Sequence, residues 1–594
     1  MDRLCSFIRF KCCSSRQPAE IDGGLLHNEP SVFLHIERGL RQNPHGLAVI
    51  STHQPPRHLS SLVGDASHDE PCLAWTYTQL HRAALRVAGG LLAHGARSNS
   101  TMLLLVPNGV EYAVLLWMAV ILRLTIVCLD PGLLDASKQD ELRDLIDLTK
   151  PSIVVVQDEA GAGAVTRTLT SLNQILDQDI LGITLTKPES NTPPAWTSFL
   201  TLATSPALSP PATASLLSAA RADNPNRTHS IMFTSGTSGR PKGCPLRVSG
   251  MTHVLHSQSW LLNTENSTRA LQQAHNSRGI APAQTLQTWR AGGAVVMTGN
   301  GFDAGDLVES VRRQRVSFVV LTPAMVHAAE GEMDARSSSV SGRVDVDCVK
   351  TVQVGGDAVT REILERCCRI FPSANVVVNH GMTEGGGAFH WPFSGRKVRK
   401  IPFYGEMSPV GCVAAGAIVR IWDLERKTVC RRGQLGQLHV CCGSTIPEYL
   451  NGVSAESFYE EGGRRWFDTG DVAMMDRKGL VFILGRRKDM IRTKGSAKST
   501  AKGVMPAPVE SCLERFASQT CVVNVDGPFA VLESFSGRSE AQIRRHVVRS
   551  LGKQYTLRGV ASLQQLGMST FPVNATHKII RTEVQAAVLK YLQL

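Results

Sequence analysis

Short apolar runs alternate along this chain with longer segments whose apolar residues recur at the spacing of a helix. The strand-like runs cover residues 102–105, 153–156, 316–321 and 376–378. The helix-like segments cover residues 111–122, 140–148, 307–315 and 361–370. Strands that alternate with helices build parallel sheets, because each helix carries the chain back across the sheet. The pattern therefore predicts an α/β fold with largely parallel sheets.

The longest apolar stretch runs from Ala113 to Leu129 and contains Arg123 and Thr125. These polar residues favour a buried helix over 114–122 that leads into a strand over 125–129, and they argue against a membrane span.

Two segments are predicted to connect regular elements. Residues 200–226 are rich in Ser, Pro and Ala, which predicts a surface linker. Residues 496–502 are small and polar, which predicts a flexible loop.

Composition narrows the class of protein. At 594 residues the chain is too long for one hydrophobic core, so more than one domain is expected. The formal charge of +12 is spread along the chain without a long basic run, so anionic cosubstrates account for it and nucleic-acid binding is not expected. The 15 cysteines lack C-x-x-C spacing, which indicates reduced thiols and a cytoplasmic protein without stable membrane insertion.

Residues 1–30 are interpreted as a disordered basic extension, because the apolar run near the N-terminus is too short for a secretory signal. A degenerate organellar presequence and palmitoylation of Cys12 and Cys13 are the alternatives.

The most informative stretch is residues 234–243, which packs three glycines, four hydroxyls and two cations behind the strand-like run 231–233. Glycines let successive backbone N–H groups turn toward one anion, and the hydroxyls and cations add donors and charge. This composition predicts a phosphate-binding loop. The loop is not a Walker A sequence, since the G-x-x-x-x-G-K-[ST] spacing is missing, and a Ser/Gly linker is the alternative.

Further clusters stand at residues 379–384, 466–471, 485–491 with 494–495, and 571–579. In the first, Thr383 is suited to donate to a phosphate and Glu384 to hold Mg²⁺ at the end of a strand. In the second, Asp471 is suited to accept the hydroxyls of a ribose. A turn or a helix cap is the alternative for the first of these clusters, and a plain turn is the alternative for the second.

Taken in order and spacing, these clusters resemble those of the adenylate-forming enzymes, which include the acyl- and aryl-CoA synthetases. The resemblance runs from Trp75 to Arg581, nearly the whole chain. It implies a large N-terminal domain of two parallel-sheet α/β subdomains plus a β-barrel-like subdomain, followed by a small mobile α+β C-terminal domain. The implied boundaries are 31–485 for the AMP-binding domain and 486–594 for the C-terminal domain.

The resemblance also implies the chemistry: a carboxylate attacks the α-phosphate of ATP, and a thiol, usually coenzyme A, then displaces AMP. ATP, Mg²⁺ and coenzyme A are the expected cosubstrates and cofactors. The site residues it implies for phosphates and catalysis are Thr234, Ser235, Gly236, Thr237, Ser238, Gly239, Lys242, Thr383 and Lys578, with Glu384 for the metal. For adenine and ribose it implies Gly355, Gly356, Asp357, His380, Gly381, Met382, Asp471 and Arg486.

Three further assignments concern the acid and the domain motion. Lys488 falls at the position of the family's hinge, and His275 resembles a histidine that lines the acid pocket, although a structural histidine fits nearly as well. Gly385 and the two glycines after it would leave room for a bulky acyl group.

The chain departs from the family pattern toward its end. His577 replaces the glycine before the adenylating lysine, about six residues are extra between Gly495 and Val504, and the segment 521–528 looks shortened by much of a strand-loop-strand unit. Adenylation is therefore better supported than thioester formation. The leading hypothesis is an acid–CoA ligase for a fatty, aryl or polyketide acid, resembling fungal secondary-metabolite ligases. Loading of a separate carrier protein and a nucleotide-binding pseudoenzyme are the alternatives.

Overall fold

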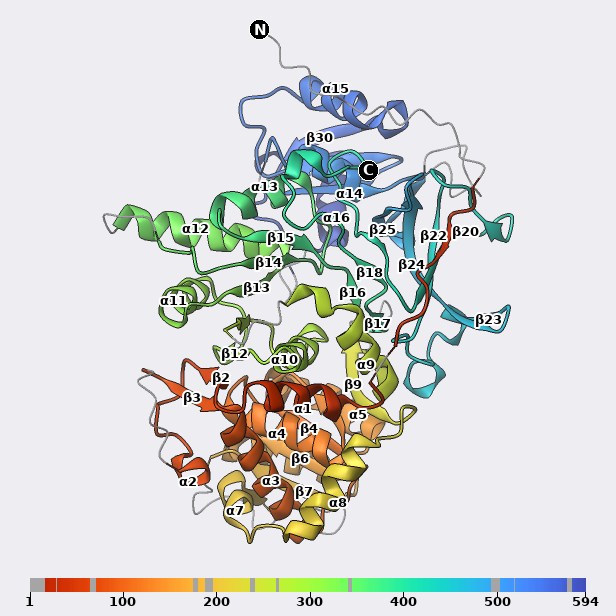
Figure 1. Ribbon diagram of the computed structural model, residues 1–594. Coiled ribbons are helices and arrows are strands. Elements are labelled where there is room, and N and C mark those ends of the chain that lie inside the picture. Colours follow the sequence, from red (N-terminus) through yellow and green to blue (C-terminus); the bar gives the residue numbers. More distant parts are fainter. Residues whose placement is uncertain are drawn as a thin grey trace.

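The computed structural model describes residues 17–27, 29–64, 71–174, 180–186, 196–234, 241–262, 267–339, 344–492, 503–517, 519–573 and 579–593. These residues form two seven-stranded, mostly parallel sheets, an antiparallel seven-stranded sheet, and a small three-stranded sheet near the C-terminus (Figure 1). The predicted α/β class is confirmed.

The first sheet has the order β10-β9-β5-β4-β6-β7-β8, and all of its neighbours are parallel except β9 and β10. Its strands are β4 (Thr101–Leu105), β5 (Thr125–Cys128), β6 (Ile153–Val156), β7 (Leu181–Thr184), β8 (Trp196–Ser198), β9 (Thr228–Thr234) and β10 (Lys242–Arg247). The helices of this part are α2 (Ser60–Val63), α3 (Tyr77–Ala93), α4 (Val110–Leu122), α5 (Gln139–Thr149), α6 (Glu159–Ser171), α7 (Phe199–Thr204) and α8 (Pro210–Arg221).

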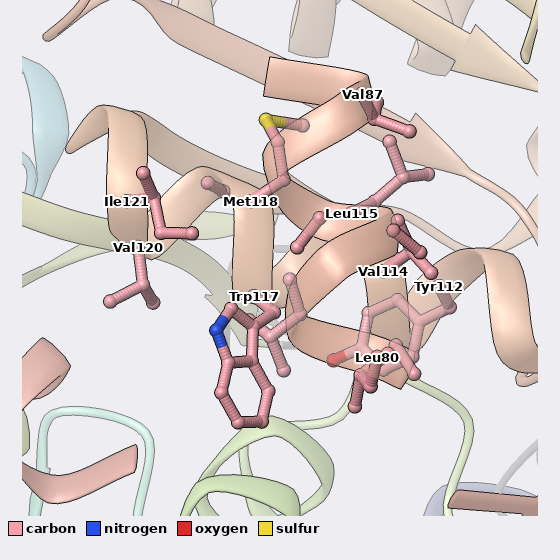
Figure 2. Packing of buried hydrophobic residues seen from close by; sticks show 14 of the residues in the cluster. Leu80, Val87, Tyr112, Val114, Leu115, Trp117, Met118, Val120 and Ile121 are labelled. Carbon is pink, nitrogen blue, oxygen red and sulfur yellow. The ribbon is translucent and has the colours of Figure 1, made fainter. Parts of the chain in front are cut away.

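Helix α4 is apolar except for Glu111 and the Tyr112 hydroxyl in its first turn, and every one of its residues is buried, as the sequence predicts for 114–122. Figure 2 shows its side chains packed with Leu80 and Val87 of α3. The Trp117 indole donates to His81 Nδ1 at 3.2 Å. The centre of the Trp117 ring lies 5.0 Å from that of Trp289 on helix α10 (Ile280–Arg290), which packs with the second parallel sheet described below. The two parallel sheets therefore share one hydrophobic core.

The second sheet has the order β15-β14-β13-β11-β12-β2-β3, parallel except for the pair β2 and β3. Its strands are β2 (Leu47–Ser51), β3 (Leu73–Thr76), β11 (Arg269–Gln272), β12 (Ala294–Met297), β13 (Phe318–Leu321), β14 (Thr351–Val354) and β15 (Asn375–Val378). Its helices are α1 (Val32–Gln42), α9 (Val248–Ser257), α10 (Ile280–Arg290), α11 (Ala304–Gln314), α12 (Pro323–Ser339) and α13 (Arg361–Ile370).

The third sheet is antiparallel and runs β1-β20-β22-β24-β23, with β21 on β20 and β25 on β24. Its strands are β1 (Glu20–Asp22), β20 (Ala417–Asp423), β21 (Thr428–Val429), β22 (Leu435–Cys442), β23 (Phe458–Glu461), β24 (Arg464–Met475) and β25 (Val481–Arg486). Its path is open, so within the described residues it is not a closed barrel. Two two-stranded pairs lie between it and the second sheet in the chain: the short hairpin of β16 (Gly381–Met382) with β17 (Gly385–Gly386), and β18 (Phe389–His390) with β19 (Cys412–Val413), which are joined by a long connection.

The C-terminal part is α+β, as expected. Its strands are β26 (Ile491–Arg492), β27 (Gly503–Val504), β28 (Thr520–Asn524), β29 (Pro528–Leu532) and β30 (Gly559–Ser562), and its helices are α14 (Pro506–Leu513), α15 (Glu540–Leu551) and α16 (Arg581–Tyr591). The prediction that 521–528 lacks much of a strand-loop-strand unit is wrong, because β28 and β29 pair over five positions. Only the turn is short, and Asp526 and Gly527 close it with φ of 51° and 135°.

Two other predictions need correction. Residues 17–22 are not a disordered extension: β1 pairs with β20, and Ala19 is fully buried against the same sheet. Residues 200–226 are not a plain linker, because they contain most of α7 and all of α8. Ser209 caps the N-terminus of α8 and proline occupies its first turn, a start signal that composition alone hides.

Residues 1–16 and the predicted loop 496–502 lie outside the described residues. Among the described helices, none combines the length and the apolar character that crossing a bilayer requires.

Candidate active site

Lys242 opens strand β10 and lies directly opposite Thr234, the last residue of β9. The predicted phosphate loop between them, including Ser235, Gly236, Thr237, Ser238 and Gly239, lies outside the described residues. The Lys242 ammonium donates to Ser454 Oγ at 2.6 Å and lies 5.0 Å from the centre of the Tyr449 ring. The β9–β10 hairpin therefore holds the Lys242 ammonium at the end of the predicted phosphate loop.

Thr383 and Glu384 form the turn between β16 and β17. The Tyr449 hydroxyl donates to Glu384 Oε1 at 2.5 Å, and the Ile446 N–H donates to the Glu384 carbonyl at 2.8 Å. Burial, followed by the charge of Glu384, raises the pKa of Tyr449, so the phenol keeps its proton and stays a donor. This contact orients one carboxylate oxygen and leaves the other for a ligand.

Asp471 and Arg486 face each other across β24 and β25. Arg486 Nε lies 3.2 Å from Asp471 Oδ1, and Arg486 Nη1 donates to the Thr469 carbonyl at 2.7 Å. Burial raises the pKa of Asp471, while the charge of Arg486 opposes the rise. The cluster 466–471 lies inside the long strand β24, so the alternative of a plain turn does not apply.

The segment Gly355–Asp357 follows β14, and His380 follows β15. A Cβ on Gly355 would lie 2.2 Å from the Asn379 carbonyl oxygen, so the two backbones approach too closely for any side chain. Burial and then the charge of Arg486 lower the pKa of His380 to about 4, which makes the ring neutral at physiological pH. The His380 ring stands edge-on to Phe389, with 5.4 Å between ring centres.

These residues converge from several elements. Gly355, Gly356, Asp357, His380, Gly381, Met382, Thr383 and Glu384 all lie beyond the carboxyl ends of β14 and β15, where ligands bind in parallel sheets. Burial raises the pKa of Tyr449 and of Asp471, and the charge of Arg486 opposes both rises while that of Glu384 adds to them, so the Asp471–Arg486 pair and the Glu384 group share one electrostatic environment.

Besides the loop residues 235–239, two predicted residues stand apart from this group. Lys488 is exposed in the single turn Arg487–Asp489 after β25. Lys578 is outside the described residues, between Val573 and Ile579, which pair as an isolated bridge.

The His275 ring is satisfied by protein groups: Nε2 bonds with the Val106 carbonyl at 3.2 Å, and Nδ1 accepts from the Ser277 N–H at 3.2 Å. Burial lowers the pKa of His275.

Near Thr383 the structure has a small cavity of about 20 Å³, room for about one water. Its lining residues come from α9, α10, β13, β14 and the turn after α9, and they are Val254, Gln258, Leu261, Leu262, Ile280, Ala283, Gln284, Gln287, Phe318 and Gln353. A Cβ on Gly279, just before α10, would lie 3.7 Å from Thr383 Oγ1, so the start of α10 adjoins the Thr383–Glu384 turn.

The glycines of the run 385–387 are explained better by close packing of the backbone than by room for a bulky acyl group. A Cβ on Gly385 would lie 2.9 Å from Thr445 Cα, and one on Gly387 would lie 2.0 Å from Ser257 Oγ. At Gly386 the nearest atom is the Val254 methyl carbon of the cavity wall, at 3.6 Å. His275 does not line this cavity.

Sequence reasoning missed Tyr449, Ser454 and the glutamines of the cavity. Tyr449 and Ser454 lie in a connection without a recognisable motif, and only the fold brings them to Glu384 and Lys242. Gln284 and Gln287 carry a weak signal, since they recur with Ile280 and Ala283 at helical spacing.

Two parallel sheets, a cation beside a glycine-rich loop, and an acidic residue paired with arginine across from it define a nucleotide-binding enzyme of the adenylate-forming class. The chain belongs to the AMP-binding enzyme family, whose pattern matches residues 63–450.

The relatives agree with this assignment. The chain is 46% identical to an acyl–CoA ligase of Pestalotiopsis microspora, over 97% of this chain and 99% of that protein. It is 24% identical to 4-coumarate–CoA ligase 3 of Arabidopsis thaliana, over 87% and 88% of the two chains.

Among solved structures, ATP-bound MatB from Rhodopseudomonas palustris superposes with a TM-score of 0.70 at 18% identity, covering 96% of this chain and 100% of that one. The o-succinylbenzoate coenzyme A synthetase of Bacillus subtilis in complex with ATP and magnesium gives a TM-score of 0.66 at 17% identity, covering 93% and 99%. At these identities the likeness establishes the fold.

Proposed function

We propose that this chain activates a carboxylic acid with ATP to an acyl-adenylate and transfers the acyl group to coenzyme A, as an AMP-forming acid–CoA ligase. The observation that carries the proposal is that two groups of residues share one electrostatic environment: Lys242, Tyr449 and Glu384 on one side, and Asp471 with Arg486 on the other. The near full-length relative named an acyl–CoA ligase supports the same reaction.

The first half-reaction brings two anions together, because a carboxylate attacks a phosphate. Cations and aligned donors must therefore neutralise the charge that builds up at phosphorus. Lys242, the residue after the phosphate loop, supplies a cation, and the Thr383 hydroxyl lies close to Gly279 at the start of α10. Lys578 is assigned the bridge between the carboxylate and ATP.

Glu384 is the proposed Mg²⁺ ligand, because the Tyr449 phenol donates to one of its carboxylate oxygens and the other oxygen is left to bind the ion. Within the described residues no cluster of three or more His, Cys, Asp or Glu side chains suits a metal. A single carboxylate fits Mg²⁺, which usually takes one or two protein carboxylates and completes its shell with water and substrate phosphates. When bound, the ion offsets phosphate charge.

The adenosine part of ATP is assigned to the Asp471–Arg486 pair and to the segment that follows β14. Asp471, held by Arg486, is assigned to accept the ribose hydroxyls, and Gly355–Asp357, directly after β14, are assigned to pack against adenine. The neutral His380 ring suits stacking on a purine, because it carries no charge that must be desolvated.

The second half-reaction is assigned to residues 486–594, with Lys488 as the hinge and residues 31–485 as the adenylation domain. The complete β28–β29–β30 sheet supports a working C-terminal domain. Coenzyme A is the proposed acceptor, with a separate carrier protein as the alternative, and a fatty, aryl or polyketide acid of secondary metabolism is the proposed substrate. The free thiols of the described residues support a cytoplasmic location.

Pyrophosphate exchange over a panel of such acids, with and without coenzyme A, tests the proposal. An acid–CoA ligase gives acid-dependent exchange and a thioester. Exchange without a thioester favours a carrier protein, and ATP binding without exchange for any acid favours a pseudoenzyme.

A further inference from the structure

Helices α1, α9 and α10 pack against one another near the middle of the molecule (Figure 1) and bring several basic side chains together. This group, the basic cluster, consists of His35 and Arg38 of α1, His256 of α9 and Arg290 of α10. Arg290 is only 8% exposed and His35 only 1%. A buried charge normally has an opposite charge beside it, because burial removes the water that would solvate it.

The two arginines of the basic cluster lack such a partner. The Arg290 Nε–H donates to His35 Nδ1 at 3.1 Å, and within the described residues neither guanidinium forms an ion pair or any other side-chain hydrogen bond. Glu37, the carboxylate of α1, is taken by three hydrogen bonds from Arg221. Burial, followed by the charge of Arg38, lowers the pKa of Arg290, so the two like charges lie close to each other.

The two histidines add further donors. Burial, followed by the neighbouring basic groups, lowers the pKa of His35 to about 3, so its ring is neutral at physiological pH. Because Arg290 can only donate, His35 Nδ1 is the acceptor and the ring proton lies on Nε2. This Nε2 is buried and has no hydrogen-bond partner among the described residues. His256 Nε2 accepts from the Glu29 N–H at 3.2 Å, which leaves the donor of His256 on Nδ1.

Every nitrogen that the basic cluster has left to offer is therefore a donor. The carboxylate that acts on the cluster is that of Glu29, whose charge opposes the lowering of the pKa of Arg290 and of His256 by burial. Glu29 is exposed and forms no ion pair within the part of the chain that the structure describes. One carboxylate against two guanidiniums leaves a net positive charge. Such a set of donors suits an anion with several acceptor oxygens.

The basic cluster is separated from the candidate active site by the length of α10. Gly279, just before the helix, adjoins Thr383, whereas Arg290 is the last residue of the helix. At 1.5 Å per residue, the two ends lie roughly 16 Å apart. An anion at the basic cluster is therefore distinct from a phosphate at Thr383.

We infer that the basic cluster is a second anion site, which binds a phosphate group through the Arg38 and Arg290 guanidiniums and the two imidazoles. Guanidinium groups match the spacing of phosphate oxygens, and their charge-assisted hydrogen bonds are stronger than neutral ones. Because Arg38 is half-buried, the site opens to solvent on the side of α1 and admits either free phosphate or the phosphate group of an ester. The inference does not depend on the proposed reaction.

Calorimetric titration of the full chain with inorganic phosphate, at constant ionic strength, tests the inference. Arg38→Gln and Arg290→Gln should each weaken phosphate binding about tenfold or more, the usual effect of losing a hydrogen bond from a charged group. Arg82→Gln removes an exposed arginine from α3 and is the matched control, which should bind phosphate like the unaltered chain. Glu29→Gln removes the competing carboxylate and should tighten phosphate binding about twofold to fivefold.

The same titration of Lys242→Ala separates the basic cluster from the predicted phosphate loop. Binding that persists in Lys242→Ala and is weakened in Arg38→Gln supports the second site, and the reverse pattern overturns it. A titration with phenyl phosphate distinguishes the two sources of the phosphate group: binding at least as tight as that of inorganic phosphate indicates an ester, and weaker binding indicates the free ion.

Absence of phosphate binding by the unaltered chain overturns the inference, and so does equal binding by Arg38→Gln, Arg290→Gln and Arg82→Gln. If Arg290→Gln does not fold, Arg38→Gln decides, because the Arg38 side chain is half-buried and makes no bond that the fold would lose.

Discussion

The candidate active site and the basic cluster hold their charged groups in different ways. On the nucleotide side the groups are charged and other side chains hold them: Ser454 and Tyr449, far away in sequence, hold Lys242 and Glu384, and Arg486 on the neighbouring strand holds Asp471. In the basic cluster the two guanidiniums form no ion pair within the described residues, and the atoms left to bind are donors.

This difference has a chemical consequence. Charged groups can stabilise a transition state in which charge builds up, so changes on the nucleotide side should lower the rate of adenylation for every acid. The basic cluster lies at the far end of α10 from Thr383, so changes there should alter phosphate binding and leave the rate of adenylation within about twofold of that of the unaltered chain. The following predictions test this division, beginning with the largest effect.

Lys578→Ala should lower acid-dependent pyrophosphate exchange by about 10²–10³-fold, the usual effect of removing one group that stabilises charge in the transition state. ATP binding, followed by calorimetry, should change little. Lys590→Ala, which removes an exposed lysine from the last turn of α16, is the control and should retain full activity. A Lys578→Ala enzyme with normal exchange would remove this lysine from the reaction.

Gly355→Ala should distort the backbone on the nucleotide side of the site. The added Cβ meets the Asn379 carbonyl oxygen at 2.2 Å, and relieving that contact must separate the ends of β14 and β15. We expect a loss of about 1–3 kcal/mol in stability, with a raised KM for ATP. Gly331→Ala on α12 is the matched control, because its Cβ would meet no atom within 4 Å. Equal melting temperatures for the two variants would contradict the expectation.

Tyr449→Phe removes the hydroxyl that orients Glu384. Exchange should fall about tenfold for all acids alike, as expected for one hydrogen bond to a charged group, and the Mg²⁺ concentration for half-maximal rate should rise. Tyr459→Phe, on β23, loses a phenol that contacts Arg420 and should leave the Mg²⁺ requirement unchanged. Weaker binding of phosphate to the basic cluster in Tyr449→Phe would break the division between the two regions.

The charged groups on the nucleotide side and their partners differ in how well the sequence reveals them. Phosphate chemistry needs particular residue types at fixed spacings, so Lys242, Glu384 and Asp471 could be found from motifs. Their partners could not, since Tyr449 and Ser454 reach them only through the folding of a motif-free connection.

The fold shows the same contrast. Regular alternation predicted some of the strands of each parallel sheet, with residues 153–156 matching β6 and residues 376–378 falling in β15, and it predicted helices such as 361–370, which matches α13. Helix α8 was missed, because its Ser, Pro and Ala content is equally typical of a linker, and β1 was missed because its stability comes from pairing with β20, far away in sequence.

Asp471→Asn gives the smallest expected effect and separates charge from packing. Burial raises the pKa of Asp471 in the folded chain above its ordinary value of 3.8. The folded state then holds the proton more tightly than the unfolded one, so this carboxyl contributes stability below about pH 4 that is lost as the pH rises through the folded pKa. At neutral pH the ionised Asp471 therefore slightly lowers the free energy of unfolding of the protein without nucleotide, and Asn avoids this loss.

The Asp471→Asn variant should melt on the order of a degree or two higher at pH 7 without nucleotide. It should bind ATP about threefold to tenfold more weakly, because the charged acceptor of the ribose hydroxyls is gone. Melting temperatures from pH 4 to 8, with and without ATP, measure both effects. Arg82→Gln should show neither the pH dependence nor the loss of ATP affinity, and an Asp471→Asn protein that melts lower at pH 7 would mean that the Asp471–Arg486 pair stabilises the fold.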